Sequence, residues 1–209
     1  KVYERLKREM LVNRLDPRPA LALAHLAHSA GQLDKVIEGA DAALAALGRR
    51  EENGPADPTE LSGQERDRVQ REVFRQLLWF VQGQPKMDAS VRGVLFDRLA
   101  AVATVPSDVV TYQLARGDFL EEMGKPHDAI EHYQFILMDH ALSSQLYERP
   151  NGSRRASLEV KLRQAALIRR HPTVYEHYDA MAALRLDQLL ADPHASPDEL
   201  LNITKQFPL

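Results

Sequence analysis

The chain of 209 residues contains no cysteine. Without a thiol it cannot form a disulfide, a thiolate zinc site or a cysteine nucleophile. This absence does not identify the compartment, because cytosolic and envelope proteins can both lack cysteine. No apolar run approaches the roughly 18 to 20 residues that a membrane-spanning helix requires, so we expect no membrane insertion. The opening residues, Lys1 to Arg8, are charged and amphipathic and have no signal-peptide core.

An excess of basic residues is also missing. The 27 Lys and Arg residues stand against 30 Asp and Glu residues, which gives a net charge of -3. Proteins that bind nucleic acids usually carry a basic excess, because their cations displace counterions from the phosphates. We therefore expect no nucleic-acid partner.

Aromatic residues make up only 6% of the chain, and Ala and Leu supply most of the apolar surface. Both residues favour helices. Apolar positions repeat at helical spacing, and no strand alternation of useful length occurs. The sequence predicts an all-α fold of about ten helices: an opening helix that ends near Pro17, then 19–30, 34–47, 64–81, 89–103, 108–123, 126–140, 154–170, 173–191 and 197–206. Asp88, Ser107 and Ser196 are the expected N-caps.

Two segments interrupt the helices. Residues 49–63 are polar, carry Gly and Pro and have no periodicity, which predicts a flexible loop. Residues 148–153 predict a second loop. Because the other connections are short, the helices are expected to form antiparallel hairpins within a single domain that spans residues 1–209.

One segment, Val110 to Ala141, has the strongest internal pattern. Gly117 lies in its first helix, Gly124 at the turn, and Ala129 and Tyr133 on the inner face of its second helix. Small residues let two helices approach, the turn glycine permits a positive φ, and the aromatic is expected to fill the gap toward the next hairpin. This spacing resembles the tetratricopeptide repeat (TPR), a helix-turn-helix of about 34 residues.

Two weaker copies flank this best repeat. In residues 18–48 the corresponding positions are Ala24, Gly31, Val36, Ala40 and Ala43. In residues 175–209 they are Leu184, Ala191, Ser196, Leu200 and Ile203, and both glycine positions are lost. The alternative is an irregular helical bundle in which one hairpin matches the repeat by chance.

The resemblance implies a curved α-solenoid whose first helices line a concave groove. The positions that correspond to the groove are Arg18, Leu21, His25, His28, Thr111, Leu114, Asp118, Glu121 and Glu122. Family members that clamp a C-terminal carboxylate use Lys, Arg and Asn at such places, and this chain does not have them. An acidic or mixed groove favours a basic or apolar partner segment. The alternative is that these acidic residues only keep an exposed face soluble.

Patterns of catalytic and ligand-binding residues are missing from the sequence. His25 and His28 could share one helix face, but no third ligand accompanies them. The sequence has no nucleophile elbow, no Walker loop and no GxGxxG motif. We therefore expect no catalytic, cofactor-binding or metal-binding residues, and a protein that is not an enzyme.

The sequence thus predicts a non-catalytic protein interaction scaffold. The chain begins at Lys1 without Met, so we expect a piece of a larger multidomain protein, and its Ala-, Leu- and Arg-rich composition is typical of GC-rich bacteria. One alternative is a structural spacer or a domain that self-associates, which exposed apolar faces at Phe74, Trp79, Phe80 and Phe96 would favour. Another is a regulatory helical domain attached to an enzyme outside this segment.

Overall fold

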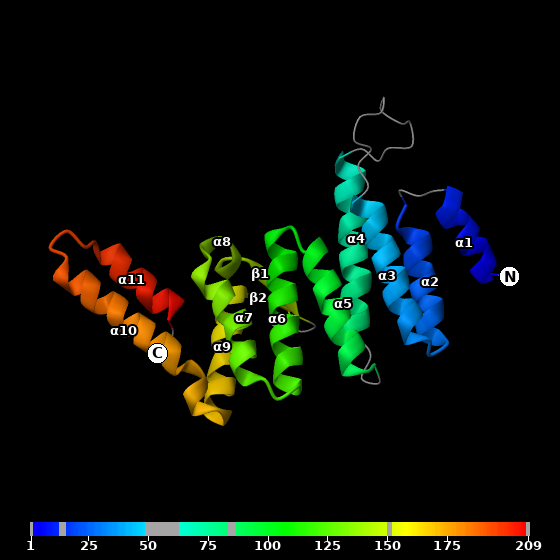
Figure 1. The fold of residues 1–209 in the computed structure, drawn as a ribbon. Helices are drawn as coiled ribbons and strands as arrows, with labels where there is room; N and C mark the ends of the chain where they lie inside the picture. Colours follow the sequence, from blue (N-terminus) through cyan, green and yellow to red (C-terminus); the bar gives the residue numbers. More distant parts are fainter. Residues whose placement is uncertain (1, 13–15, 49–62, 83–86, 150–151, 208–209) are drawn as a thin grey trace. The chain divides into compact units, whose positions relative to one another are not determined.

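The computed structural model describes residues 2–12, 16–48, 63–82, 87–149 and 152–207. In this part of the chain the protein is all-α, with eleven α-helices, one 3-10 helix and one short strand pair (Figure 1). The expected single domain divides into two compact units, unit 1 (Lys1–Thr104) and unit 2 (Val105–Leu209). Each unit is built from helices that pack on their neighbours in sequence, so each has a core of its own. The predicted flexible loop 49–63 lies outside the described residues, except for Gly63, which begins a helix.

Unit 1 consists of helices that pair in the order of the chain. Its elements are α1 (Val2–Val12), α2 (Arg18–Ser29), α3 (Leu33–Gly48), α4 (Gly63–Gln82) and α5 (Ala89–Val102). The pairs α2–α3 and α4–α5 form two antiparallel hairpins, and α3 also packs against α4 and α5 (Figure 1). Gly31, with φ +69°, forms the turn between α2 and α3, as the repeat pattern predicted.

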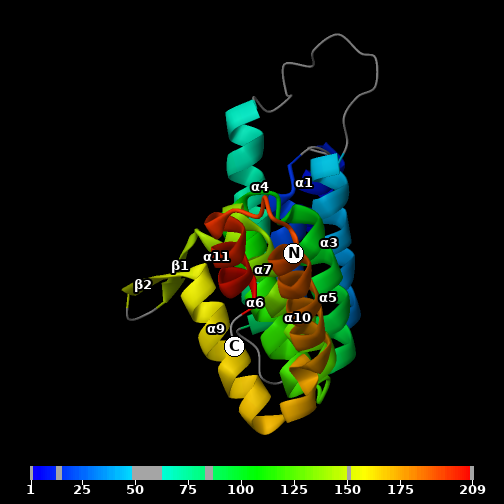
Figure 2. The same cartoon turned by 90° about the vertical axis from the view of Figure 1, so that its left-hand side faces the viewer.

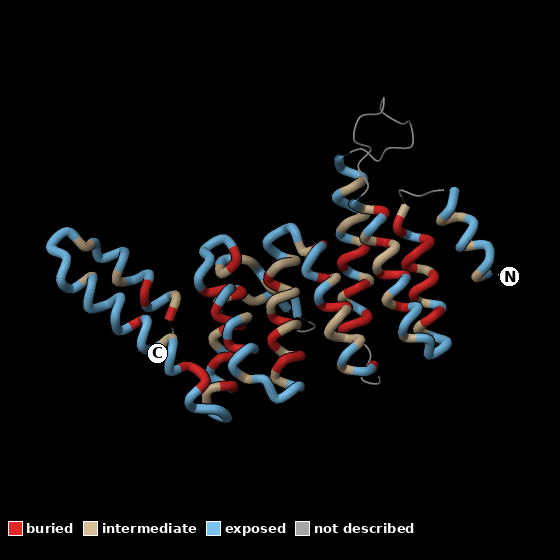
Figure 3. The backbone as a smooth tube through the Cα atoms, viewed as in Figure 1, coloured by how far each residue is buried: buried red, intermediate tan, exposed pale blue. Residues whose placement is uncertain are grey.

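Small residues allow α2 and α3 to approach closely. A Cβ atom on Gly39 would lie 2.8 Å from the Cβ of Ala24 and 2.9 Å from the carbonyl oxygen of Ala20. Buried residues lie along each of the helices α2, α3, α4 and α5 (Figure 3). Phe74, Phe80 and Phe96 are all buried, whereas Trp79 is 43% exposed.

Unit 2 begins with a hairpin and ends with another. Its elements are α6 (Pro106–Glu122), α7 (Pro126–Met138), α8 (His140–Ser143), β1 (Leu146–Arg149), β2 (Gly152–Arg155), α9 (Ala156–Arg170), the 3-10 helix η1 (Pro172–Tyr175), α10 (Glu176–Ala191) and α11 (Pro197–Gln206). The strand pair lies beside α9 (Figure 2).

The α6–α7 hairpin follows the best repeat closely. Gly124 ends α6 with φ +69°, the same value as Gly31 in unit 1. Ala129 and Tyr133 are fully buried on the inner face of α7. A Cβ atom on Gly117 would lie 2.3 Å from Cε1 of Tyr133, so the aromatic ring occupies the space that the missing side chain leaves. Tyr133 therefore packs closely against α6 within its own hairpin.

Two local predictions were wrong. Residues of the predicted loop 148–153 contribute to the antiparallel pair β1–β2, in which Tyr147 faces Arg154. Strands of four residues are too short to show a recognisable alternation. The expected cap Ser107 lies inside the first turn of α6, because Pro106 begins the helix and Val105 takes the N-cap position. Asp88 and Ser196 cap α5 and α11 as predicted.

The C-terminal hairpin α10–α11 has a small core. Ala182, Ile203 and Phe207 are buried there, with Tyr178 and Leu189 packed at the edge. Leu184, which the repeat correspondence places at the inner small position, is 61% exposed. Residues 175–209 therefore form a helical hairpin in which Ile203 lies on the inner face, as the correspondence indicated, and Leu184 does not.

Candidate functional site

A groove lies between α2 and α4 in unit 1. Its volume is about 600 Å³. It is lined by Arg18, Leu21, Ala22 and His25 from α2 and by Glu65, Arg68, Val69, Glu72, Arg75 and Gln76 from α4. Three of the four groove residues predicted in this unit, Arg18, Leu21 and His25, therefore lie in one site.

Periodicity explains how α4 contributes its side of the groove. The six α4 residues recur every three or four positions, as Glu65, then Arg68 and Val69, then Glu72, then Arg75 and Gln76, which places them on one helix face. The α4 segment lacks the repeat motif, so the repeat spacing did not predict these six residues. The spacing of Glu65, Val69, Glu72 and Gln76 was the available signal.

The floor of the groove is apolar and is bordered by a hydrogen-bonded rim. Leu21 is buried, and Ala22 and Val69 are half-buried. Nε2 of His25 lies 2.6 Å from Oε1 of Gln76, and Nε2 of Gln76 donates to Glu72 over 2.7 Å. This chain of contacts connects the two helices and fixes the side chains at one end of the groove.

The arginines of the groove differ in their partners. Nε of Arg18 pairs with Oδ1 of Asp16 at 2.8 Å, and this hydrogen bond and charge raise the pKa of Arg18. Nη2 of Arg75 pairs with Oε2 of Glu72 at 2.5 Å. Arg68 makes no ion pair or hydrogen bond with any residue that the structure describes. It is the cation that remains available to a ligand.

His28, the fourth predicted residue of this unit, does not line the groove. Its ring lies 5.6 Å from the ring of Trp79 and 5.7 Å from that of Phe80, measured between centroids. His25 contacts the same two rings at 4.9 and 4.6 Å. Both imidazoles are thus packed against aromatic side chains, and the described residues contain no group of three or more His, Asp or Glu side chains placed to hold a metal ion.

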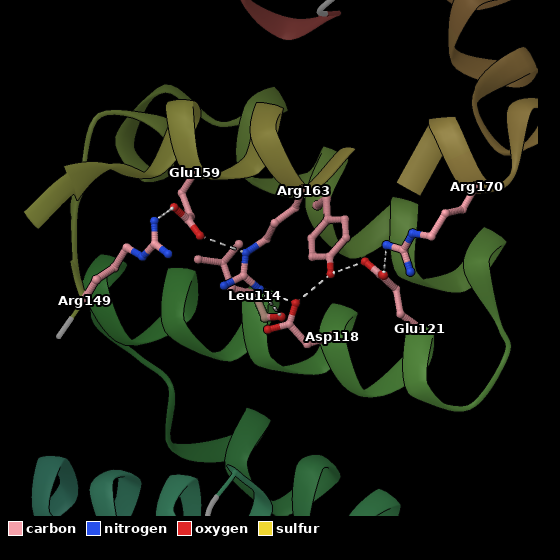
Figure 4. A network of polar contacts seen from close by, with 8 residues as sticks. Leu114, Asp118, Glu121, Arg149, Glu159, Arg163 and Arg170 are labelled. Atoms are coloured by element: carbon pink, nitrogen blue, oxygen red, sulfur yellow. Dashed lines mark hydrogen bonds and ion pairs between the residues drawn. The ribbon is translucent and has the colours of Figure 1, made fainter. Parts of the chain in front are cut away.

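Two of the three predicted acidic positions of α6, Asp118 and Glu121, belong to a polar network in unit 2 (Figure 4). Arg163 of α9 pairs with Asp118, and Nη2 of Arg170 pairs with Oε2 of Glu121 at 2.6 Å. The hydroxyl of Tyr133 donates to both carboxylates at 2.8 Å. Burial, together with the charge of Asp118, raises the pKa of Tyr133 well above its usual value. Two of the acidic side chains expected to line a groove on α6, Asp118 and Glu121, are therefore paired with arginines of α9.

Glu159 connects this network to the strand pair. Its side chain is only 6% exposed and accepts from Arg149 at 3.2 Å, Arg154 at 3.4 Å and Arg163 at 3.2 Å. Burial alone lowers the pKa of Arg163, but Asp118, Tyr133 and Glu159 together raise it by more, so the guanidinium stays charged. These contacts serve the packing of α9 on the rest of unit 2.

The remaining predicted positions of α6 are Leu114, Thr111 and Glu122. Leu114 is buried, and its carbonyl accepts from Arg163. The hydroxyl of Thr111 donates to the carbonyl of Ser107 at 2.9 Å. Glu122 is exposed.

The chain matches no protein-family model, no curated protein and no solved structure. Among the described residues, no helix combines the length and the apolar character that crossing a membrane requires.

Proposed function

We propose that this chain is a non-catalytic protein interaction module of the TPR-like helical-repeat type, and that the α2–α4 groove receives a segment of a partner protein. The observation that carries the proposal is the groove itself. Its volume of about 600 Å³ falls within the range of ligand sites in proteins, and it is lined by the first helices of two successive hairpins. In helical repeats this is the face that binds partners.

The repeat character rests on shared local geometry. Gly31 and Gly124 have the same positive φ at equivalent turns. Small residues lie where the paired helices are closest, Ala24 and Gly39 in one hairpin and Gly117 in the other. These features support a TPR-like α-solenoid, which remains part of the proposal.

The lining of the groove suggests the chemistry of the segment. Leu21, Ala22 and Val69 offer an apolar strip, and Arg68 offers an unpaired cation beside it. Glu72 is already occupied by Arg75. A partner segment could place an apolar side chain on this strip and a carboxylate beside the guanidinium of Arg68. The expected preference for a basic segment came from the α6 acids, and it loses its basis here because those acids are paired.

A selection from a random peptide library displayed on phage tests the proposal. The intact protein should enrich peptides in which Asp or Glu lies near an apolar residue. Arg68→Glu should abolish that enrichment or reverse its charge preference. Arg71→Glu is the matched control, because Arg71 is also an exposed arginine of α4 but lies outside the groove. No enrichment, or equal enrichment by both variants, would contradict the proposal.

The alternative of a structural spacer depended on exposed aromatic faces. Three of the four residues, Phe74, Phe80 and Phe96, are buried in the core of unit 1. This burial removes the surface that would have favoured the spacer, and so the interaction module is the better-supported function.

A further inference from the structure

The C-terminal hairpin carries an apolar stripe that its own core does not use. Only Ala182 is buried along the whole of α10. Leu190 is 69% exposed and Leu186 is 40% exposed. Asp179, Ala183, Leu186 and Leu190 follow one another at spacings of four, three and four, so they form one stripe along the helix. Figure 3 shows how much of α10 and α11 is exposed.

Acidic residues border this stripe. Helical spacing places Glu176 and Asp187 beside it, and Asp179 begins it. None of these three carboxylates forms an ion pair with a residue of the described chain. The opposite side of α10, which holds Met181 and Leu184, is nearer to Arg185 and has no such border.

The C-terminal hairpin carries a net negative charge. Residues 176–206 contain six acidic and two basic residues, a net charge of -4. Because the complete chain carries -3, all other residues together carry +1. The apolar stripe therefore lies on a hairpin of net negative charge.

We propose that the α10 stripe, defined as Asp179, Ala183, Leu186 and Leu190, is a docking surface for a basic amphipathic helix of a partner protein. Two exposed leucines one turn apart match the apolar side of such a helix. Lysine or arginine at its edges would pair with the bordering carboxylates, which complements the charge and directs the encounter.

A second copy of the chain fits this surface less well. Symmetric pairing of two α10 stripes would bring two sets of Glu176, Asp179 and Asp187 into one interface. Like charges at an interface oppose association. The charge of the hairpin thus favours a basic partner over self-association, and this surface is separate from the α2–α4 groove.

Fluorescence anisotropy with a designed peptide pair tests the proposal on the intact chain. One labelled peptide is an amphipathic helix of leucine and lysine, and its twin carries glutamate in place of every lysine. We expect the lysine peptide to bind, the glutamate twin not to bind, and added salt to weaken binding. Leu190→Gln should lower the affinity for the lysine peptide by about tenfold, since it removes one leucine from the interface. Asp187→Lys should weaken it as well.

Leu184→Gln is the matched control, because Leu184 is an equally exposed leucine on the opposite side of the same helix. It should leave binding unchanged, and so should Arg68→Glu in the α2–α4 groove, which separates this surface from the proposed one. Equal binding of the two peptides, or equal loss with Leu184→Gln and Leu190→Gln, would overturn the proposal. It would also be overturned by sedimentation showing a dimer of the chain that Leu190→Gln dissociates.

Discussion

Replacing Gly117 with alanine tests the close packing of α6 against α7. The new Cβ would lie 2.3 Å from Cε1, 2.8 Å from Cζ and 2.9 Å from Cδ1 of Tyr133. The Tyr133 ring cannot yield freely, because it is fully buried and its hydroxyl is hydrogen-bonded to Asp118 and Glu121. The substitution therefore forces the ring to move or the helices to separate.

The size of the effect follows from three contributions. Overpacking a core costs about 1 to 3 kcal/mol. Loss of a hydrogen bond from Tyr133 to a carboxylate costs about 1.5 to 3 kcal/mol more. The better helix propensity of alanine returns about 1 kcal/mol. We expect Gly117→Ala to lower the free energy of unfolding by about 3 kcal/mol.

Urea denaturation of the intact chain, followed by far-UV circular dichroism, measures this change. Trp79, the only tryptophan, lies in unit 1, so its fluorescence reports the unfolding of that unit alone. For Gly117→Ala we expect a lower free energy of unfolding when circular dichroism is the signal. The urea midpoint of the Trp79 fluorescence should stay unchanged. Gly93→Ala is the matched control, since nothing lies within 4 Å of the new Cβ in α5, and it should stabilise by about 0.5 to 1 kcal/mol. If both variants changed stability by the same amount, the packing argument would be wrong.

Two further substitutions test the charges of unit 2. Glu159→Gln removes the carboxylate that three arginines share. It should lower the free energy of unfolding, measured by urea denaturation, by about 1 to 3 kcal/mol. An unchanged urea midpoint would show that the buried network does not contribute to stability. Burial, followed by the charge of Arg116, lowers the pKa of His132, so the folded protein holds this side chain neutral. An unfolded histidine takes up a proton near about pH 6.5. The stability from neutral His132 is therefore complete above about pH 7 and is lost as the pH falls toward the folded pKa. His132→Gln should reduce the fall in unfolding free energy between about pH 7 and pH 5, whereas His127→Gln, on the exposed face of α7, should not. The same pH slope in both variants would contradict this.

Local sequence signals predicted most of the helices. Nine of the ten expected segments agree with observed helices to within three residues, because Pro, Gly and capping residues mark the ends of helices locally. The capping box at Ser196 and Glu199 is the clearest case. The strand pair β1–β2 escaped prediction, since strands of four residues depend on contacts with α9 and not on their own pattern.

Three of the ten residues that line the α2–α4 groove could also be predicted from the sequence. The repeat spacing located Arg18, Leu21 and His25, which line the α2–α4 groove. Equivalent reasoning located Asp118 and Glu121 on the corresponding helix of the next hairpin, and there the expected groove is filled by arginine side chains. The repeat pattern describes the packing within each hairpin. It does not predict which side chains of a later helix, such as Arg163 and Arg170 of α9, pair with residues of that hairpin.

The sequence by itself thus determined the all-α class, the helix ends and the positive-φ turns, because each depends on residues close together in the chain. Only the tertiary structure decided which interhelical spaces are open. Arg163 reaches Asp118 across 45 positions and Arg170 reaches Glu121 across 49. Arg68 lies against the α2–α4 groove without such a partner in the described chain. Charge pairing over such separations depends on how helices pack, and packing is a property of the assembled core that no local pattern records.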